Sequence, residues 1–417
     1  MLFANERWPV RTLGKDLLAG LTVALVALPL AIGFGVASGA GAAAGIATAI
    51  VAGLIAAIFG GSRFQVSGPT GAMTVVLIPL AASYGVSAVM LTGLLAGAIL
   101  IFTGVLRLGQ HIHRLPTALI EGFTAGIAVV IALQQVPAGL GVHPALGESI
   151  LAGAWTAAAD WATSPNWWAL AVTAATAAGL IWAGKRWHKL PLSLVAVVGV
   201  TALNSLAHLG LAVVGTLPRF GAVSTNFLSA AGHIGDLAIP ALSVALLGAL
   251  ESLLSAKIAD RMRPDVEPHD SNRELIGQGL ANLVAPFFGG IPATAALART
   301  AVNVRAGAQS RWSAAAHSVF LLIFVLALAP LVEQIPLPAL AGVLIATASH
   351  MVKIGELRKT AKLSHLDGIV LGATLLVTVV SNLTAAVLVG LVLFIGLRKT
   401  RLSLRNTPID DEETLGD

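Results

Sequence analysis

Long apolar stretches recur along the chain from Leu17 to Leu397, separated by short breaks that carry glycine, proline or charge. A helix needs about 20 mainly apolar residues to cross the hydrocarbon core of a bilayer. The pattern therefore predicts an all-α membrane protein with about fourteen transmembrane segments, several of them short. The predicted spans cover roughly residues 15–38, 39–60, 66–83, 86–106, 116–136, 165–184, 191–216, 236–257, 273–289, 293–304, 312–330, 337–352, 366–381 and 383–398.

Clusters of Lys and Arg precede the first predicted span and follow every second span after it. Basic residues accumulate in cytoplasmic loops, so this alternation predicts cytoplasmic N- and C-termini and a multi-pass protein of the cell inner (cytoplasmic) membrane. Of the 25 basic residues, only Arg219 and Arg299 fall elsewhere. The stretch from Pro137 to Trp168 has no Lys or Arg and is rich in tryptophan, which is typical of an external interface; tryptophans that pack a core are the alternative.

The composition excludes several classes of function. Charged residues make up 11% of the chain, against roughly 25% in soluble domains. The net charge of +5 does not indicate a nucleic-acid partner, because the basic residues lie where a membrane protein needs them. The chain has no cysteine, nucleotide-binding loop, metal-ligand spacing or nucleophile elbow. We therefore expect membrane lipid around the protein, no enzyme activity, no metal and no cofactor except a coupling ion.

The two halves of the chain resemble each other where the third span of each half is interrupted. Phe64–Ala72 leads into an apolar segment, and Phe288–Ala296 leads into another; their prolines, Pro69 and Pro292, are 223 positions apart. With seven spans in each half, an odd number, the second copy must be inverted. A 7+7 inverted repeat with glycine- and proline-interrupted segments is the pattern of a secondary transporter that binds its substrate near the membrane midplane.

The interruptions predict short extended stretches at Phe64–Gly68 and Phe288–Ile291, each followed by a half-helix that opens at or beside a proline. The first amides of a helix have no intrahelical partner, and the helix dipole adds about half a positive charge there. Two such ends that face each other form an anion site. The alternative is a pair of proline kinks without function. The predicted substrate-binding residues are Thr70, Gly71, Ala72, Ala296, Leu297, Ala298 and Arg299, with Phe34 as an apolar wall; a packing role is the alternative for Phe34.

Ionisable residues inside predicted spans are costly and suggest function. Glu251 lies near the middle of the eighth span and is the candidate for proton coupling. Arg299 lies about two turns into the second half-helix, where it adds positive potential or pairs with Glu251; a purely structural ion pair is the alternative. Glu121 is interpreted as an interfacial residue, with a ligand of the anion as the alternative, and His317 and His350 are interpreted as structural or interfacial residues.

The segment Phe64–Ala72 closely resembles the signature of the sulfate permease family, the prokaryotic branch of the solute carrier family 26 anion transporters. The similarity extends over essentially the whole chain. It includes Ala27–Gly35, Gly122–Gly126, Leu246–Leu254 and Ala295–Val304.

The resemblance implies the fold shared with nucleobase transporters, in which a core domain moves against a gate domain. On this basis residues 1–110 (spans 1–4) and 236–335 (spans 8–11) are expected to form the core. Residues 111–235 (spans 5–7) and 336–400 (spans 12–14) are expected to form the gate, and residues 401–417 a cytoplasmic tail. The family usually carries a cytoplasmic STAS domain after the last span, so that domain is expected to be absent or removed here. Relatives often dimerise, which makes a homodimer a possible assembly.

Carried over to this sequence, the resemblance assigns Phe34 to an aromatic position of the pocket and the two half-helix ends to the anion. Leu30 stands where relatives often have glutamine and Ala298 where many have serine, so backbone amides are expected to dominate binding. Glu251 stands where sodium-coupled bicarbonate members have aspartate, and a glutamate there is more typical of proton coupling.

The sequence therefore predicts a secondary active transporter of a small inorganic or organic anion of the sulfate, bicarbonate or dicarboxylate class. The expected mechanism is proton-coupled symport by elevator-like alternating access. The alternatives are a sodium-coupled bicarbonate symporter, a nucleobase permease of the same fold and an uncoupled anion channel.

Overall fold

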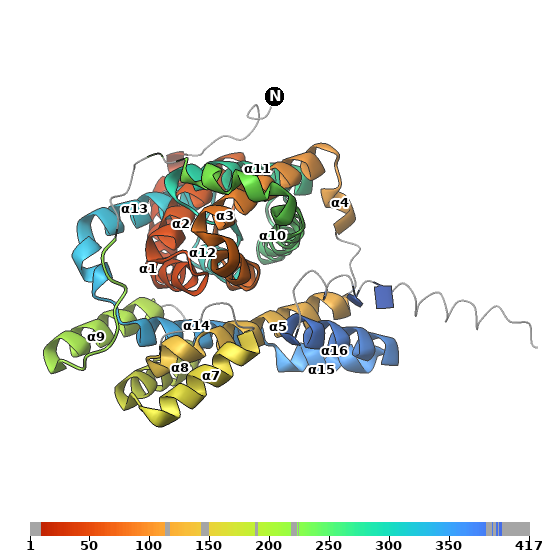
Figure 1. The fold of residues 1–417 in the computed structure, drawn as a ribbon. Coiled ribbons are helices and arrows are strands. Elements are labelled where there is room, and N and C mark those ends of the chain that lie inside the picture. Colours follow the sequence, from red (N-terminus) through yellow and green to blue (C-terminus); the bar gives the residue numbers. More distant parts are fainter. Residues whose placement is uncertain are drawn as a thin grey trace, which may run out of the picture. The chain divides into compact units, whose positions relative to one another are not determined.

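The computed structural model describes residues 10–112, 117–142, 150–187, 191–217, 223, 225–380, 386, 389–390 and 392–393 (Figure 1). The described chain is almost entirely helical. Its α-helices are α1 (Leu13–Ala37), α2 (Ala42–Phe59), α3 (Gly71–Val105), α4 (Gly109–Ile112), α5 (Thr117–Gln134), α6 (Val136–Leu140), α7 (Ile150–Thr163), α8 (Trp167–Arg186), α9 (Leu192–Ala207), α10 (Ile234–Met262), α11 (Ser271–Val284), α12 (Leu297–Arg305), α13 (Trp312–Glu333), α14 (Leu337–Met351), α15 (Ile354–Leu363) and α16 (His365–Val380). Short 3-10 helices cover Val10–Thr12 (η1), Asn226–His233 (η2) and Ala285–Phe288 (η3), and two strands cover Ser67–Gly68 (β1) and Thr294–Ala295 (β2).

Eight helical segments in the described part are long and apolar enough to cross a membrane, and α9 and α16 are shorter apolar helices. The prediction of a helical membrane protein is confirmed. The count of fourteen spans in a 7+7 repeat stays a prediction, and the last predicted span, 383–398, lies largely outside the described residues.

One predicted boundary agrees with the structure and another differs from it. The third and fourth predicted spans, 66–83 and 86–106, both lie within α3, whose two helical parts are separated by the non-helical residue Gly85 (φ 78°, ψ 174°). Glycine permits this positive φ without a steric penalty, so the helix breaks at the predicted boundary between the two spans. The basic stretch predicted as a connection after residue 352 forms the helix α15, which carries both apolar and charged residues.

Backbone contacts divide the chain into two compact units. The first contains Met1–Arg114 and Ile127–Met351, and the second contains Leu115–Gly126 and Val352–Asp417. In the second unit, α15 packs on α16, and apolar side chains of the first turn of α5 pack on α16. The division into core and gate domains remains a prediction.

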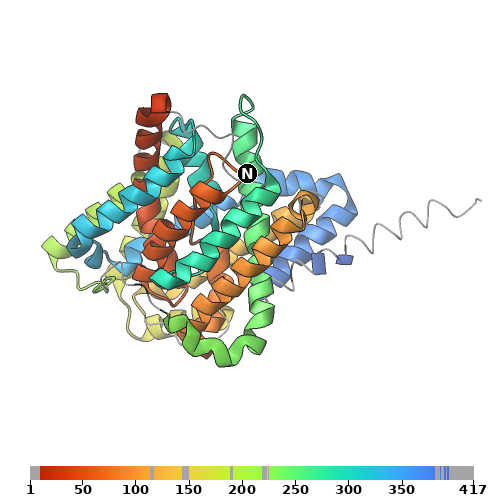
Figure 2. The same cartoon turned by 90° about the horizontal axis from the view of Figure 1, so that it is seen from above.

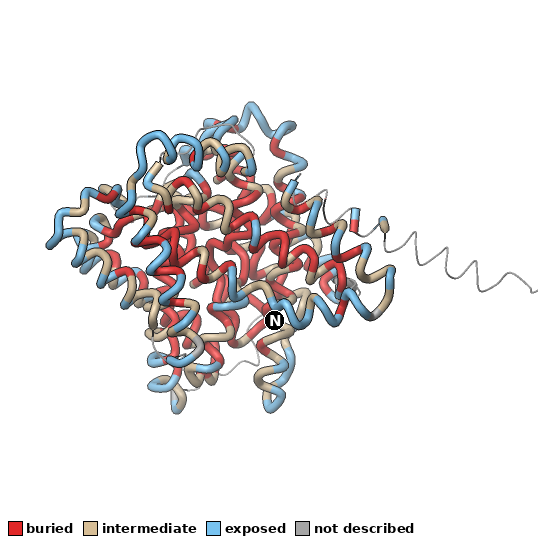
Figure 3. The backbone as a smooth tube through the Cα atoms, turned by 90° about the horizontal axis from the view of Figure 1, so that it is seen from below, coloured by how far each residue is buried: buried red, intermediate tan, exposed pale blue. Residues whose placement is uncertain are grey.

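In the first unit, helices from the two halves of the sequence alternate. Helix α1 packs against α13 and α2, α2 packs against α13 and α11, and α3 packs against α11 and α10. Figure 2 shows the red and orange helices of the first half interleaved with the green and cyan helices of the second. The segments facing these contacts are buried, as the red stretches of Figure 3 show.

Small residues allow these helices to approach closely, as is typical of membrane bundles. At the crossing of α3 and α11, a Cβ on Gly97 would lie 2.7 Å from the carbonyl oxygen of Gly279, and a Cβ on Gly279 would lie equally close to that of Gly97. The abundance of glycine thus has a packing reason at this crossing.

A buried carboxylate fixes the start of α11. Glu274 is 1% exposed, and its Oε2 accepts hydrogen bonds from the backbone amides of Gly61 and Ser62 at 2.8 and 3.0 Å. Its Oε1 accepts from Gln278 Nε2 at 2.8 Å. Glu274 therefore holds the turn that follows α2 against α11.

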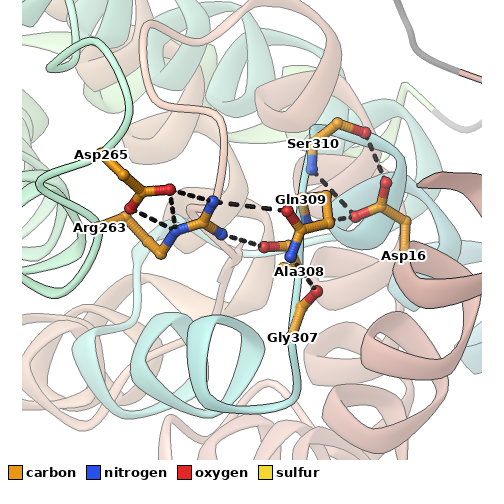
Figure 4. A network of polar contacts seen from close by, with 7 residues as sticks. All are labelled: Asp16, Arg263, Asp265, Gly307, Ala308, Gln309 and Ser310. Atoms are coloured by element: carbon orange, nitrogen blue, oxygen red, sulfur yellow. Dashed lines mark hydrogen bonds and ion pairs between the residues drawn. The ribbon is translucent and has the colours of Figure 1, made fainter.

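A second polar network joins α1, the end of α10 and the turn after α12 (Figure 4). Asp16 accepts hydrogen bonds from the backbone amides of residues 309–310. Arg263 donates to the carbonyl oxygen of Ala308 at 2.6 Å and to Asp265 at 2.9 Å. The hydrogen bond from Arg263 keeps the pKa of the exposed Asp265 carboxyl below its usual value.

The substitution Glu274→Ala should destabilise the protein strongly, because it leaves two buried backbone amides without an acceptor. A loss of a few hydrogen bonds to a charged group corresponds to a fall in unfolding temperature of roughly 5 °C or more. Thermal unfolding in detergent, followed by tryptophan fluorescence, measures the effect.

The matched control is Glu267→Ala, because the Glu267 side chain is 80% exposed and pairs only at the surface with Arg63. Equal shifts for the two variants would contradict the role of Glu274.

Candidate functional site

Two short strands from opposite halves of the chain pair inside the first unit. Strands β1 and β2 are antiparallel, with Ser67 opposite Ala295 and Gly68 opposite Thr294. The backbone amide of Ala296 extends the pair by donating to Val66 O at 3.0 Å. The predicted extended stretch Phe64–Gly68 contains β1, whereas β2 lies outside the second predicted stretch, Phe288–Ile291.

In the second half, the extended stretch lies later than the sequence predicted. Residues Ala285–Phe288 form a 3-10 turn, and the strand lies at Thr294–Ala295, after Pro292. Pro69 comes two residues before α3, whereas Pro292 comes five residues before α12. The helices begin at Gly71 and Leu297, 226 positions apart, so the repeat has a different offset from that of the prolines.

Both half-helices begin at this strand pair without a side-chain cap. Thr70 and Ala296 are the N-caps; both have extended backbones, and neither side chain accepts a hydrogen bond from its helix. Because the strands are antiparallel and each helix follows its own strand, the two helices leave the short pair at its opposite ends, and both N-termini lie next to the pair. The leading amides of α3 and α12 are therefore hydrogen-bond donors that no intrahelical acceptor satisfies.

Side chains of α10 hold the strand pair in place. The Ser252 carbonyl accepts a hydrogen bond from Gln65 Nε2 at 2.9 Å, and the Ser252 hydroxyl accepts one from the amide of Ala295 at 3.2 Å. One residue thus anchors the extended segments of both halves. Extended backbone inside a membrane needs such partners, because no water satisfies it.

Arg299 connects the two helix starts. It lies in the first turn of α12 and is 1% exposed, and its Nη2 donates to the carbonyl oxygen of Pro69 at 2.7 Å. Its Nη1 is buried and has no hydrogen-bond partner among the described residues. The predicted position about two turns into the helix is wrong, because β2 delays the start of α12 to Leu297.

Glu251 contacts the same short segment. Thr70 Oγ1 donates a hydrogen bond to Glu251 Oε2 at 2.9 Å, and this hydroxyl does not cap α3. Arg299 and Glu251 thus contact neighbouring residues, Pro69 and Thr70. No ion pair or hydrogen bond joins them directly in the part of the chain that the structure describes.

The remaining predicted binding residues differ in exposure. Gly71 and Ala72 are buried, whereas Leu297 is 45% exposed and Ala298 is also exposed. Phe34, 6% exposed on α1, reaches the start of α3: its Cε1 lies 3.0 Å from the position of a Cβ on Gly71. The structure therefore brings Phe34 beside the beginning of α3 and leaves the beginning of α12 open.

The sequence did not point to several residues near this site. Thr74, in the first turn of α3, donates a hydrogen bond to Gln134 Oε1 at 2.9 Å, and Ile131 contacts Gly71. Gln134 and Ile131 lie near the end of an apolar span, where sequence alone gives no signal of an intramembrane contact.

The three other ionisable candidates behave differently from one another. His317 is not interfacial: it is fully buried, and neither ring nitrogen has a partner among the described residues. His350 is exposed at the end of α14. Glu121 is half-buried on α5, and its Oε2 has no partner within the described chain.

Comparison with known proteins identifies the fold and the family. Residues 13–374 match the sulfate permease family. The chain belongs to the sulfate permease family. The solved transmembrane domain of a cyanobacterial bicarbonate transporter, BicA, aligns with a TM-score of 0.83 and 31% identity, over 91% of this chain and 98% of that one. The structure of SLC26A9 aligns with a TM-score of 0.84 at 18% identity, over 94% and 66% of the two chains, and supports the fold alone.

Two family members with curated names have similar sequences. The putative sulfate transporter YvdB of Bacillus subtilis is 35% identical over 413 residues, 96% of this chain and 76% of that protein. The bicarbonate transporter BicA of Synechocystis is 31% identical over 391 residues, 91% of this chain and 68% of that protein. The family consists of transporters, so the chain is a membrane transport protein and not an enzyme.

Gly68→Ala should disrupt the strand pair and the packing of Arg299 beside it. Gly68 has φ 154°, and a Cβ there would meet Arg299 Nη1 and lie 3.2 Å from the Cα of Ala49. We expect a clear fall in the unfolding temperature measured in detergent. Gly179→Ala on the exposed face of α8 is the control, because a Cβ there meets nothing within 4 Å. A Gly68 variant as stable as the Gly179 variant would show that the strand pair tolerates a side chain.

Proposed function

We propose that this protein is a secondary active transporter that carries a small anion, of the sulfate, bicarbonate or dicarboxylate class, together with a proton. The observation that carries the proposal is the pair of uncapped helix starts joined by Arg299, whose Nη2 donates to Pro69 O and whose buried Nη1 has no partner among the described residues. Related proteins that are named as sulfate and bicarbonate transporters support the anion class.

The charges at the site favour an anion. Each helix start contributes about half a positive charge and Arg299 a full one, against one negative charge on Glu251 when it is ionised. Leading amides near residues 71–72 and 297–299 bind the anion, with Phe34 as an apolar wall. Ala296 and Ala298 bring no side-chain donor, so backbone amides and Arg299 supply the selectivity for negative charge.

The same charges couple a proton to the anion. Protonation of Glu251 removes the negative charge near the site and leaves Arg299 and the helix starts uncompensated, so the anion binds more tightly. By linkage, the bound anion raises the affinity of Glu251 for its proton by the same factor. Thr70 transmits the change, because its hydroxyl contacts Glu251 while its carbonyl begins α3.

Movement across the membrane follows the elevator scheme of the fourteen-span 7+7 inverted repeat. The core domain (residues 1–110 and 236–335) carries the anion past the gate domain (residues 111–235 and 336–400). The termini face the cytoplasm of a cell whose inner membrane holds the protein, and the chain assembles as a homodimer in lipid. The alternating basic clusters and the two half-helices support this arrangement.

Glu251→Gln should abolish the acceleration of anion uptake by an inward proton gradient, because glutamine keeps the size of the side chain and cannot exchange a proton. Uptake of labelled sulfate, bicarbonate and succinate into proteoliposomes, with and without a pH gradient, measures this. A sodium gradient in place of the pH gradient tests sodium coupling. Competition of the uptake by uracil tests nucleobase transport.

The control is Asp236→Asn, a carboxylate in the first turn of the same helix that pairs with the exposed His233. It should leave proton dependence unchanged. Acid-driven uptake that persists in Glu251→Gln would defeat the coupling scheme.

Arg299→Gln should raise the KM for the anion about tenfold or more, since a buried charged donor at a binding site contributes roughly 1.5–3 kcal/mol. Arg305→Gln is the matched control, because Arg305 is exposed at the end of the same helix. If both variants transport with the wild-type KM, Arg299 does not contribute to anion binding.

A further inference from the structure

The last turn of α5 lies against the first turn of α3. Ile131 on α5 occupies the space that a side chain at position 71 would need, so Gly71 allows the two helices to touch. One turn further along α5, Gln134 Oε1 accepts a hydrogen bond from Thr74 Oγ1 at 2.9 Å. The carboxamide of Gln134 is therefore held beside the helix start that belongs to the anion site.

The other end of this carboxamide has no partner. Gln134 Nε2 is buried, and no described residue accepts a hydrogen bond from it. A primary amide carries two N–H donors, and a buried donor without an acceptor costs about as much as the hydrogen bond it fails to make. An anion beside the start of α3 offers the missing acceptor.

The hydroxyl of Thr74 can pair with either end of the Gln134 amide. Thr74 has one hydroxyl hydrogen and two acceptors within reach, Gly71 O at 2.6 Å and Gln134 Oε1 at 2.9 Å. The oxygen and nitrogen of an amide can exchange places by rotation about the last side-chain bond. An anion only accepts hydrogen bonds, so it turns Nε2 toward itself, and Oε1 then receives the hydroxyl of Thr74.

We propose that Gln134 is a substrate-binding residue that donates a hydrogen bond to the transported anion, and that Thr74 positions it. This inference rests on the anion transport proposed above. Gln134 lies in the predicted gate domain and Thr74 in the predicted core, so both the contact with the anion and the Thr74–Gln134 hydrogen bond break when the core moves. The gate domain therefore contributes to anion affinity only while the site is open to one side of the membrane, and not after the core has moved.

Anion binding to the purified full chain tests the role of Gln134 without transport. Sulfate and bicarbonate are titrated, and the dissociation constant is taken from the rise in unfolding temperature. We expect Gln134→Ala to weaken binding about ten- to hundredfold, as for other hydrogen bonds to a charged group. Gln134→Glu should weaken it further, because a carboxylate repels the anion.

Two variants of Thr74 test the positioning role and remain informative if Gln134 variants fold poorly. Thr74→Val keeps the shape and removes the hydroxyl, so anion affinity should fall several-fold; Thr74→Ser keeps the hydroxyl and should restore it. The control is Gln334→Ala, a glutamine exposed at the end of α13, which should bind like the wild type.

The two proposals fail in different ways. Wild-type affinity in Gln134→Ala and Gln134→Glu, or a wild-type protein that neither sulfate nor bicarbonate stabilises, would overturn the role of Gln134. Binding that depends on Gln134, in a protein that shows no uptake into proteoliposomes, would support the site and defeat the transport proposal.

Discussion

The structure depends on one constraint: backbone that leaves a helix inside a membrane must find hydrogen-bond partners within the protein. The two interrupted helices meet this constraint by pairing β1 with β2 and by recruiting side chains. Asn282 accepts from the amide of Ala293 and donates to its carbonyl, and the Thr300 hydroxyl accepts from the amide of Val66. The first amides of α3 and α12 receive no such side-chain cap, so unsatisfied donors are concentrated beside the strand pair, where we propose the anion site.

The position of the two charges follows from the same strand pair. The residues that join β1 to α3 are Pro69 and Thr70; the first binds Arg299 through its carbonyl and the second binds Glu251 through its hydroxyl. A charge from α12 and a charge from α10 are thus held within one short segment without a direct ion pair. This arrangement allows a change at Glu251 to alter the potential at the helix starts without breaking a salt bridge.

Much of this arrangement could be predicted from sequence, because some of its physical causes are local. The Gly-Pro step at residues 68–69 after an extended segment marks the first half-helix, and the apolar stretches mark the membrane helices. The sequence misplaces the extended stretch of the second half, because Pro292 does not occupy the same position relative to its strand as Pro69: β2 lies at Thr294–Ala295 and α12 begins at Leu297. The break at Gly85 could be predicted, because a glycine in a long apolar run permits a backbone conformation that interrupts the helix.

Contacts between distant segments could not be predicted. The hydrogen bonds of Glu274 with the turn after α2, the buried position of His317 and the contact of Gln134 with Thr74 each depend on how helices from different parts of the chain pack. A polar residue near the end of an apolar run has the same sequence signature whether it faces headgroups or a buried partner.

The most direct test of the account is anomalous X-ray diffraction from crystals of the full chain soaked in selenate, as a sulfate analogue, and in bromide. The account predicts an anomalous peak within hydrogen-bond distance of the first amides of both α3 and α12 and near Arg299 Nη1. A peak that lies elsewhere in the protein, with no density at the paired helix starts, would contradict it.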